Sequence, residues 1–170
     1  MFKIDRELSD KSNILEQRVL IYDPRKCSGC MYCMIACSFH HYGIIDLNKA
    51  FLHVYEDEEK PGSFINIFCT HCEYPACEAA CPAEPKAITK DPDSGIVKID
   101  KLRCIGCRSC IYACPNSIPF FDETYDTCVK CDFCNGDPIC AKYCSTGALR
   151  VVSREEAKEI VEVLFTERGD

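Results

Sequence analysis

The chain has 170 residues, of which 17 are cysteine, and its formal net charge is −7 at pH 7. So many cysteines in a short chain are typical of either a secreted disulfide scaffold or a metal protein. The acidic balance argues against a nucleic-acid-binding protein.

The N-terminal segment, residues 1–18, begins with a charged run and lacks the apolar core of a secretory signal. No apolar run in the chain approaches the ~20 residues that span a bilayer. We therefore expect a cytoplasmic protein with no direct membrane insertion. Because disulfide scaffolds belong to exported chains and the cysteine count is odd, the composition favours bound metal over disulfides.

Short strand-like segments separate the cysteine-rich stretches. Their apolar residues alternate with polar ones or form brief β-branched and aromatic runs. The turn Asp91-Pro92-Asp93-Ser94-Gly95 favours a hairpin between two of them. The predicted strands cover residues 19–22, 51–55, 64–68, 87–90, 96–99 and 148–152.

Sixteen cysteines fall into four groups that share one spacing. Groups one and three have C-x2-C-x2-C-x3-C, the bacterial ferredoxin run. Groups two and four are the same run with two and three extra residues before the third cysteine, so one motif is used four times. In chain order the groups are Cys27, Cys30, Cys33 and Cys37; Cys69, Cys72, Cys77 and Cys81; Cys104, Cys107, Cys110 and Cys114; and Cys131, Cys134, Cys140 and Cys144.

This spacing predicts four [4Fe–4S] clusters. Three thiolates at C-x2-C-x2-C wrap around one cubane, whereas the fourth cysteine lies in a short helix, points away and binds the other cluster of a pair. Structural zinc sites instead use two ligand pairs, which does not fit groups of three plus one. Histidine ligation of the Rieske type is also disfavoured. His71 lies inside group two, but that group already has four thiols, and the other histidines follow no ligand spacing.

Cys128 is the cysteine left over. A triplet that begins at Cys128 would place its fourth ligand at Pro138, whereas the triplet that begins at Cys131 continues to Cys140 and Cys144 with the usual gap. We interpret Cys128 as a small buried hydrophobe. The alternative is that it replaces a neighbouring cysteine as a ligand.

A longer helix is predicted over residues 153–168. Ser153 and Glu156 form a capping-box pattern, and Gly169 lies beyond the end. An apolar stripe then consists of Ala157, Ile160, Val161 and Leu164. We expect this stripe to pack on the protein's own strands, with docking on a partner subunit as the alternative.

The predicted architecture is α+β, with two ferredoxin-like modules related by pseudo-symmetry and a C-terminal helix. Each module would hold two [4Fe–4S] clusters. Groups two and three are close in sequence and form one module, residues 64–122. Groups one and four then pair in a discontinuous module of residues 19–45 and 124–152.

Across residues 18–152, the order and spacing of the groups resemble the four-cluster polyferredoxin subunits of molybdenum and tungsten bis-pterin oxidoreductases. These are the beta or small subunits typified by those of dimethyl sulfoxide reductase and formate dehydrogenase. The segment 130–138, with Cys140 and residues 144–149, is similar to small subunits that accompany tungsten aldehyde oxidoreductases. The departures are Ser38 and Ser145 in place of proline, and the extra Cys128.

The resemblance implies four ligand sets by position. Each set takes three cysteines of one group and the last cysteine of another. Site one would use Cys27, Cys30, Cys33 and Cys144; site two Cys131, Cys134, Cys140 and Cys37; site three Cys69, Cys72, Cys77 and Cys114; and site four Cys104, Cys107, Cys110 and Cys81.

The resemblance also implies an electron-transfer subunit of an anaerobic oxidoreductase. It would pass single electrons between a large catalytic subunit, which carries a molybdenum or tungsten pterin, and a ferredoxin or further electron-transfer subunit. A free diffusible polyferredoxin is the alternative, disfavoured by segments 1–18 and 38–63 and by the final helix. With every predicted iron bound to protein thiols and no nucleotide motif, we expect no catalytic site in this chain.

Three cations lie beside predicted ligands and could raise the potentials of nearby clusters. They are Arg108, Lys130 and Lys142. Solvated surface positions are the alternative for each of them.

Overall fold

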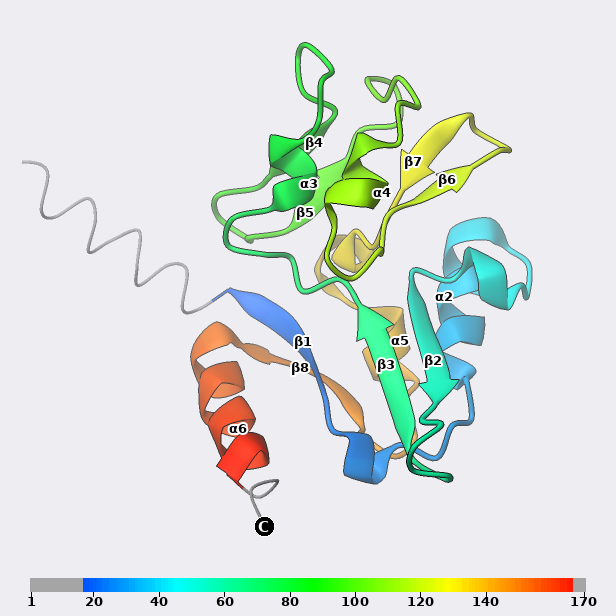
Figure 1. Ribbon diagram of the computed structural model, residues 1–170, viewed down its shortest axis with the longest axis vertical. Helices are drawn as coiled ribbons and strands as arrows, with labels where there is room; N and C mark the ends of the chain where they lie inside the picture. Colours follow the sequence, from blue (N-terminus) through cyan, green and yellow to red (C-terminus); the bar gives the residue numbers. More distant parts are fainter. Residues whose placement is uncertain (1–16, 167–170) are drawn as a thin grey trace, which may run out of the picture.

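The computed structural model describes residues 17–166, which form a mixed helix-and-strand fold (Figure 1). In this part of the chain, eight strands pair into four antiparallel two-stranded sheets, β1–β8, β2–β3, β4–β5 and β6–β7. The strands are β1 (Arg18–Tyr22), β2 (Leu52–Glu56), β3 (Phe64–Phe68), β4 (Ile88–Lys90), β5 (Val97–Ile99), β6 (Phe120–Asp122), β7 (Thr127–Val129) and β8 (Leu149–Ser153).

Helices follow the cysteine loops, as the spacing predicts. The helices are α2 (Tyr32–Tyr42), α3 (Ala76–Ala79), α4 (Ser109–Ala113), α5 (Ile139–Lys142) and α6 (Arg154–Thr166), and the 3-10 turns are η1 (Pro24–Lys26), η2 (Leu47–Lys49) and η3 (Phe133–Gly136). Helix α2 runs past Cys37 and ends at Gly43, which has a φ of 69°. Within residues 17–166, no helix is both long and apolar enough to cross a membrane.

The sheet β1–β8 brings the two ends of the described chain together, with Leu20 opposite Val151. The hairpin β4–β5 surrounds the turn at residues 91–95, which confirms that prediction. The hairpin β6–β7 was not predicted. Its strands have three residues each, as in β4–β5, but the connection at residues 123–126 contains no glycine or proline to mark a turn.

A helix carries the third cysteine of each group, and these helices meet in pairs. Only α2 extends to the fourth cysteine of its group, so the prediction that the fourth cysteine lies in a helix is wrong for the other three groups, whose last cysteines follow the helix end. Helix α2 of group one packs on α5 of group four, and α3 of group two packs on α4 of group three. The buried apolar side chains divide in the same way. A larger cluster contains Leu20, Phe51 and Phe133, and a smaller one contains Ile88 and Val97. Groups distant in the sequence are therefore neighbours in space.

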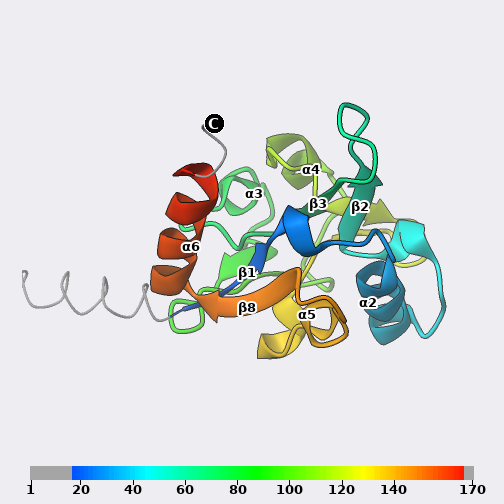
Figure 2. The same cartoon turned by 90° about the horizontal axis from the view of Figure 1, so that it is seen from below.

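Helix α6 lies against β1 and β8 (Figures 1 and 2). Ala157 and Ile160 pack on Val19, Ile21 and Val152, which confirms that the stripe covers the protein's own sheet. Val161 of the stripe is 42% exposed. The side chain of Leu164, the last residues of the predicted 153–168 helix and Gly169 lie outside the described residues, as do residues 1–16.

Ser153 caps α6, because its Oγ accepts the Glu156 N–H at 3.1 Å. We expect Ser153→Ala to weaken the first turn by about 1 kcal/mol. Amide hydrogen exchange across α6 should then be about fivefold faster, with the absorption of the bound cofactors unchanged. Ser153→Thr keeps the oxygen and should exchange at the wild-type rate. Equal rates for the alanine variant and the wild type would contradict the cap.

Candidate iron–sulfur sites

The four cysteine loops share a backbone feature. In every group the residue directly before the second cysteine has a positive φ: Gly29 (67°), His71 (46°), Gly106 (68°) and Phe133 (60°). This left-handed residue tightens the loop between the first two cysteines. Glycine adopts such a φ without strain, and at Gly29 a Cβ would also lie 2.2 Å from the Phe64 ring. The common backbone supports a single motif used four times.

Three cavities are each lined by four of the predicted ligands. Each combines three cysteines of one group with the last cysteine of another. Their cysteines are Cys27, Cys30, Cys33 and Cys144 at site one; Cys69, Cys72, Cys77 and Cys114 at site three; and Cys81, Cys104, Cys107 and Cys110 at site four, where Cys128 also lines the wall. Four convergent thiols are the donor set that a [4Fe–4S] cluster requires.

The thiols predicted for site two lie close enough for their charges to affect one another's pKa. Burial raises the pKa of Cys37 to about 12, and the charge of Cys134 adds to that shift. Burial also raises the pKa of Cys140, as do the charges of Cys37 and Cys134. The pKa of Cys131 is raised by burial, by the charge of Cys69 and, to a smaller extent, by that of Cys140. Cys69 of group two is thus close enough to Cys131 of group four for its charge to affect the Cys131 pKa.

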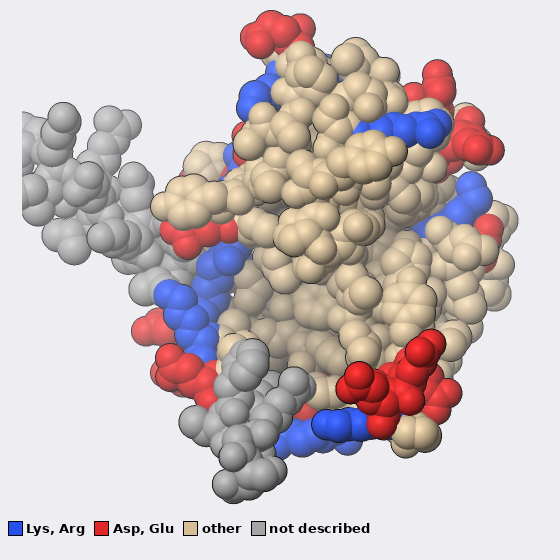
Figure 3. Space-filling model, in the orientation of Figure 1, with Lys and Arg blue, Asp and Glu red and all other residues tan. Residues whose placement is uncertain are grey.

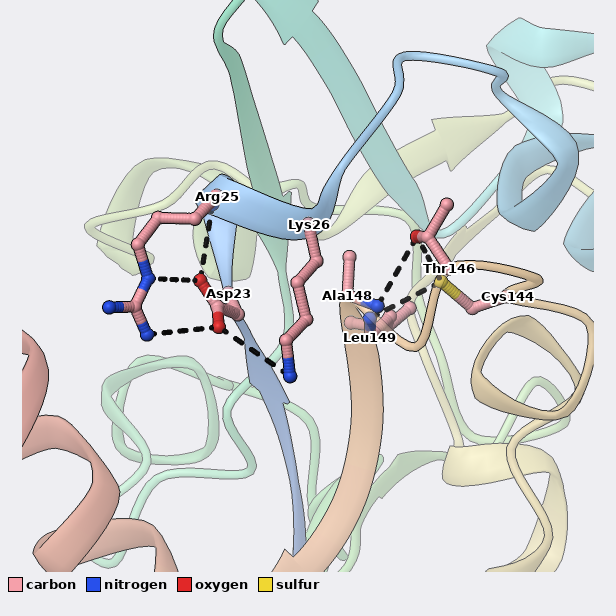
Figure 4. Close-up of polar contacts among 7 residues, drawn as sticks. All are labelled: Asp23, Arg25, Lys26, Cys144, Thr146, Ala148 and Leu149. Carbon is pink, nitrogen blue, oxygen red and sulfur yellow. Dashed lines mark hydrogen bonds and ion pairs between the residues drawn. The ribbon is translucent and has the colours of Figure 1, made fainter.

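Backbone N–H groups donate to several of the thiols. The donors and acceptors are Phe51 N to Cys37 Sγ (3.3 Å), Phe133 N to Cys131 Sγ (3.4 Å), Cys128 N to Cys104 Sγ (3.4 Å) and Leu149 N to Cys144 Sγ (3.3 Å). Burial opposes ionisation of Cys144, yet the donors Leu149 and Thr146 hold its pKa below the ordinary value (Figure 4). Since the thiolate is the form that binds iron, these donors favour metal ligation.

The β1–β8 pair also positions the first cysteine of site one. The Asp23 N–H donates to the Ala148 carbonyl at 2.8 Å, at the end of the sheet. Its buried carboxylate accepts from Arg25 Nε at 3.0 Å and Nη2 at 3.2 Å (Figure 4). These bonds with Arg25 hold the pKa of Asp23 below its usual value. Asp23 is also the N-cap of η1, because its carboxylate accepts the Arg25 N–H. Cys27 directly follows this turn.

Cys128 is 1% exposed, which confirms that it is buried. Its place in the fold differs from expectation. It lies in β7, opposite Phe121 of β6. Its N–H donates to Cys104 Sγ of group three, although group four is nearer in the sequence. The short hairpin β6–β7 produces this arrangement.

Two histidines lie beside cysteines in ways that their spacing does not predict. The Nε2 of His41 lies 3.8 Å from Cys134 Sγ and 3.7 Å from the Asp132 carboxylate. His71 is 2% exposed, and its Nδ1 accepts the Val97 N–H at 3.0 Å. Helix α2 brings His41 to group four only because it continues beyond the cysteine loop.

Comparison with known proteins places this geometry in a family. Residues 62–154 match the family model of the 4Fe-4S dicluster domain. The chain is 34% identical over 147 residues to the aliphatic sulfonate oxidoreductase, polyferredoxin-like subunit, of Pyrococcus furiosus (84% of this chain, 82% of the relative). It is 35% identical over 146 residues to a subunit of the anaerobic dimethyl sulfoxide reductase of Escherichia coli K12 (75% and 69%).

A third relative is the thiosulfate reductase electron transfer subunit of Salmonella typhi, which is 29% identical over 163 residues (86% of this chain, 81% of the relative). The resemblance seen in the cysteine spacing is thus confirmed. The chain belongs to the 4Fe-4S dicluster domain family of iron–sulfur proteins.

Proposed function

We propose that this chain is an iron–sulfur electron-transfer subunit, which passes single electrons through four [4Fe–4S] clusters between a catalytic subunit and an external redox partner. The observation that carries the proposal is the set of three cavities, each lined by four thiols from two groups. The thiols of site two would hold the fourth cluster. When bound, the clusters supply one-electron redox chemistry.

The chain's own residues would hold and connect these centres. The packing of α2 on α5 and of α3 on α4 supports two pseudo-symmetric modules, residues 19–45 with 124–152 and residues 64–122. Lys130, which directly precedes Cys131 and lines the cavity of site three, supports contact between the two pairs of clusters. The exposed thiols Cys30, Cys72 and Cys107 would let three of the sites exchange electrons at the surface.

Association with a larger subunit is supported by the relatives' descriptions and by the surface. Large apolar side chains stand exposed, among them Leu102 (98%), Tyr112 (87%) and Tyr74 (86%). Figure 3 shows one face with few charges at its centre and charged side chains around it. We propose a catalytic partner with a molybdenum or tungsten pterin, in an anaerobic, cytoplasmic complex. An exposed apolar surface of this kind favours a lasting complex over a free diffusible polyferredoxin.

The ligand assignment predicts how iron content responds to single cysteine changes. Wild-type protein should hold about sixteen irons per chain. Cys77→Ala removes a ligand of site three, so one cluster should be lost or degraded, which iron analysis and EPR would detect. Cys128→Ala is the matched buried control and should keep the wild-type content. An unchanged iron content in Cys77→Ala would contradict the assignment.

Cross-sharing between groups predicts a particular non-additivity. Cys37→Ser and Cys140→Ser both act on site two, so the double variant should lose one cluster, no more than either single variant. Cys33→Ser with Cys37→Ser changes two neighbours in the sequence but two different sites, and should lose two clusters. Equal losses in the two double variants, measured as iron and sulfide per chain, would refute the shared ligation.

The partner hypothesis predicts the form in which the protein is recovered. Purified at native expression under anaerobic conditions, it should elute with a large subunit, and metal analysis of that fraction should show tungsten or molybdenum. Recovery as a monomer alone would favour a diffusible polyferredoxin.

A further inference from the structure

Lys130 is the one lysine or arginine buried among the residues whose exposure the structure describes, with 5% of its surface accessible. Its Nζ donates to the Cys131 carbonyl at 2.7 Å and to the Val97 carbonyl. No carboxylate in the described part of the chain forms an ion pair with it. Asp132 and Lys130 line a common cavity, but the Asp132 carboxylate lies 3.7 Å from His41 Nε2 and forms its contact there. Lys130 is thus not the solvated cation that the sequence allowed.

A buried ammonium without a counter-ion is costly, and two carbonyl groups offset only part of that cost. Cysteine thiolates around Lys130 would supply the opposite charge. The lysine lines the cavity of site three together with Cys69, Cys77 and Cys114. It also directly precedes Cys131 of site two.

The position of Lys130 is a junction between the two modules. Its Nζ donates to the carbonyl of Cys131, a predicted ligand of site two, at 2.7 Å. The same side chain lines the cavity that holds the cysteines of site three. One ammonium therefore lies beside predicted ligands of both sites.

A second donor stands on the same wall. Val97, whose carbonyl accepts from Lys130, donates its N–H to His71 Nδ1 at 3.0 Å. The Nε2 of His71 therefore carries the ring proton, yet it is buried without a hydrogen-bond partner among the described residues. This wall presents an ammonium without a carboxylate partner and a His71 N–H without an acceptor among the described residues, which is the environment that an anionic cofactor would complete.

Building on the proposed function, we propose that Lys130 is the fixed counter-charge of the cluster at site three and, through the junction, of its neighbour at site two. A [4Fe–4S] cluster with four thiolates is anionic and gains a further negative charge on reduction. A buried cation therefore favours the reduced form and raises the reduction potential. It also weakens the repulsion between two adjacent anionic clusters.

The test is an EPR-monitored redox titration of the loaded, full-length protein. Lys130→Met keeps the length of the side chain without the charge, and the midpoint potential of one or two clusters should fall. The shift should persist at high salt, because a buried charge is poorly screened. Lys142→Met is the matched control: Lys142 lies between two ligands of group four, but its side chain is 59% exposed and pairs with Asp137 at 3.8 Å. It should shift no potential to a comparable extent.

Two further variants separate charge from packing. Lys130→Gln keeps a hydrogen-bond donor and should also lower the potential, whereas Lys130→Arg should keep it near that of the wild type. Unchanged potentials in both uncharged variants would overturn the inference and leave the proposed function intact. If both uncharged variants lose about four irons while Lys130→Arg keeps them, the charge is needed for the cluster. Loss in Lys130→Arg as well would assign the role to shape, against the inference. A wild-type protein without four clusters would instead refute the proposed function.

Discussion

Convergence of thiols from different groups is the constraint on which the rest of the fold depends. The cavities of sites one, three and four each combine three cysteines of one group with the last cysteine of another, so none of these groups completes a four-thiol site alone. The chain must therefore bring group one to group four and group two to group three. The pairs α2–α5 and α3–α4 and the sheet β1–β8 are the elements that achieve this. Most of the regular structure serves to hold loops together.

Negative charge is the second constraint, because thiolates are concentrated in a chain that is already acidic. The protein meets it with backbone donors more than with surface cations. N–H groups contact Cys37, Cys104, Cys131 and Cys144, each from a residue held in place by a strand, a turn or a tight loop. Dipoles placed in this way stabilise a thiolate without requiring a buried cation at every site. Lys130 is the exception: it is buried, directly precedes Cys131 and lines the cavity of site three.

The sequence predicted local features well, since their signals are local. The hairpin at residues 91–95, the Ser153 cap and the short helices after each loop depend on residues a few positions apart. The spacing also predicted which cysteines act together in loops, whereas the division into four sets came from family resemblance. Cys128 and Lys130 were harder, because β7 was not predicted and because no local signal shows that residue 130 packs on Val97 of β5. His41 was missed because nothing local in the sequence shows that α2 packs on α5 of group four.

The pairing of β1 with β8 has a consequence for how the protein is made. Residues 18–22 pair with residues 149–153, so the sheet beside groups one and four cannot form until residue 153 has left the ribosome. Groups two and three, residues 69–114, are close in the sequence, and the packing of α3 on α4 can form earlier, since chains fold as they emerge. During synthesis the group one thiols are therefore the first to appear and among the last to be enclosed. During that interval the group one thiols are most open to oxidation or to binding of the wrong metal, which favours loading of the sites of groups two and three before those of groups one and four.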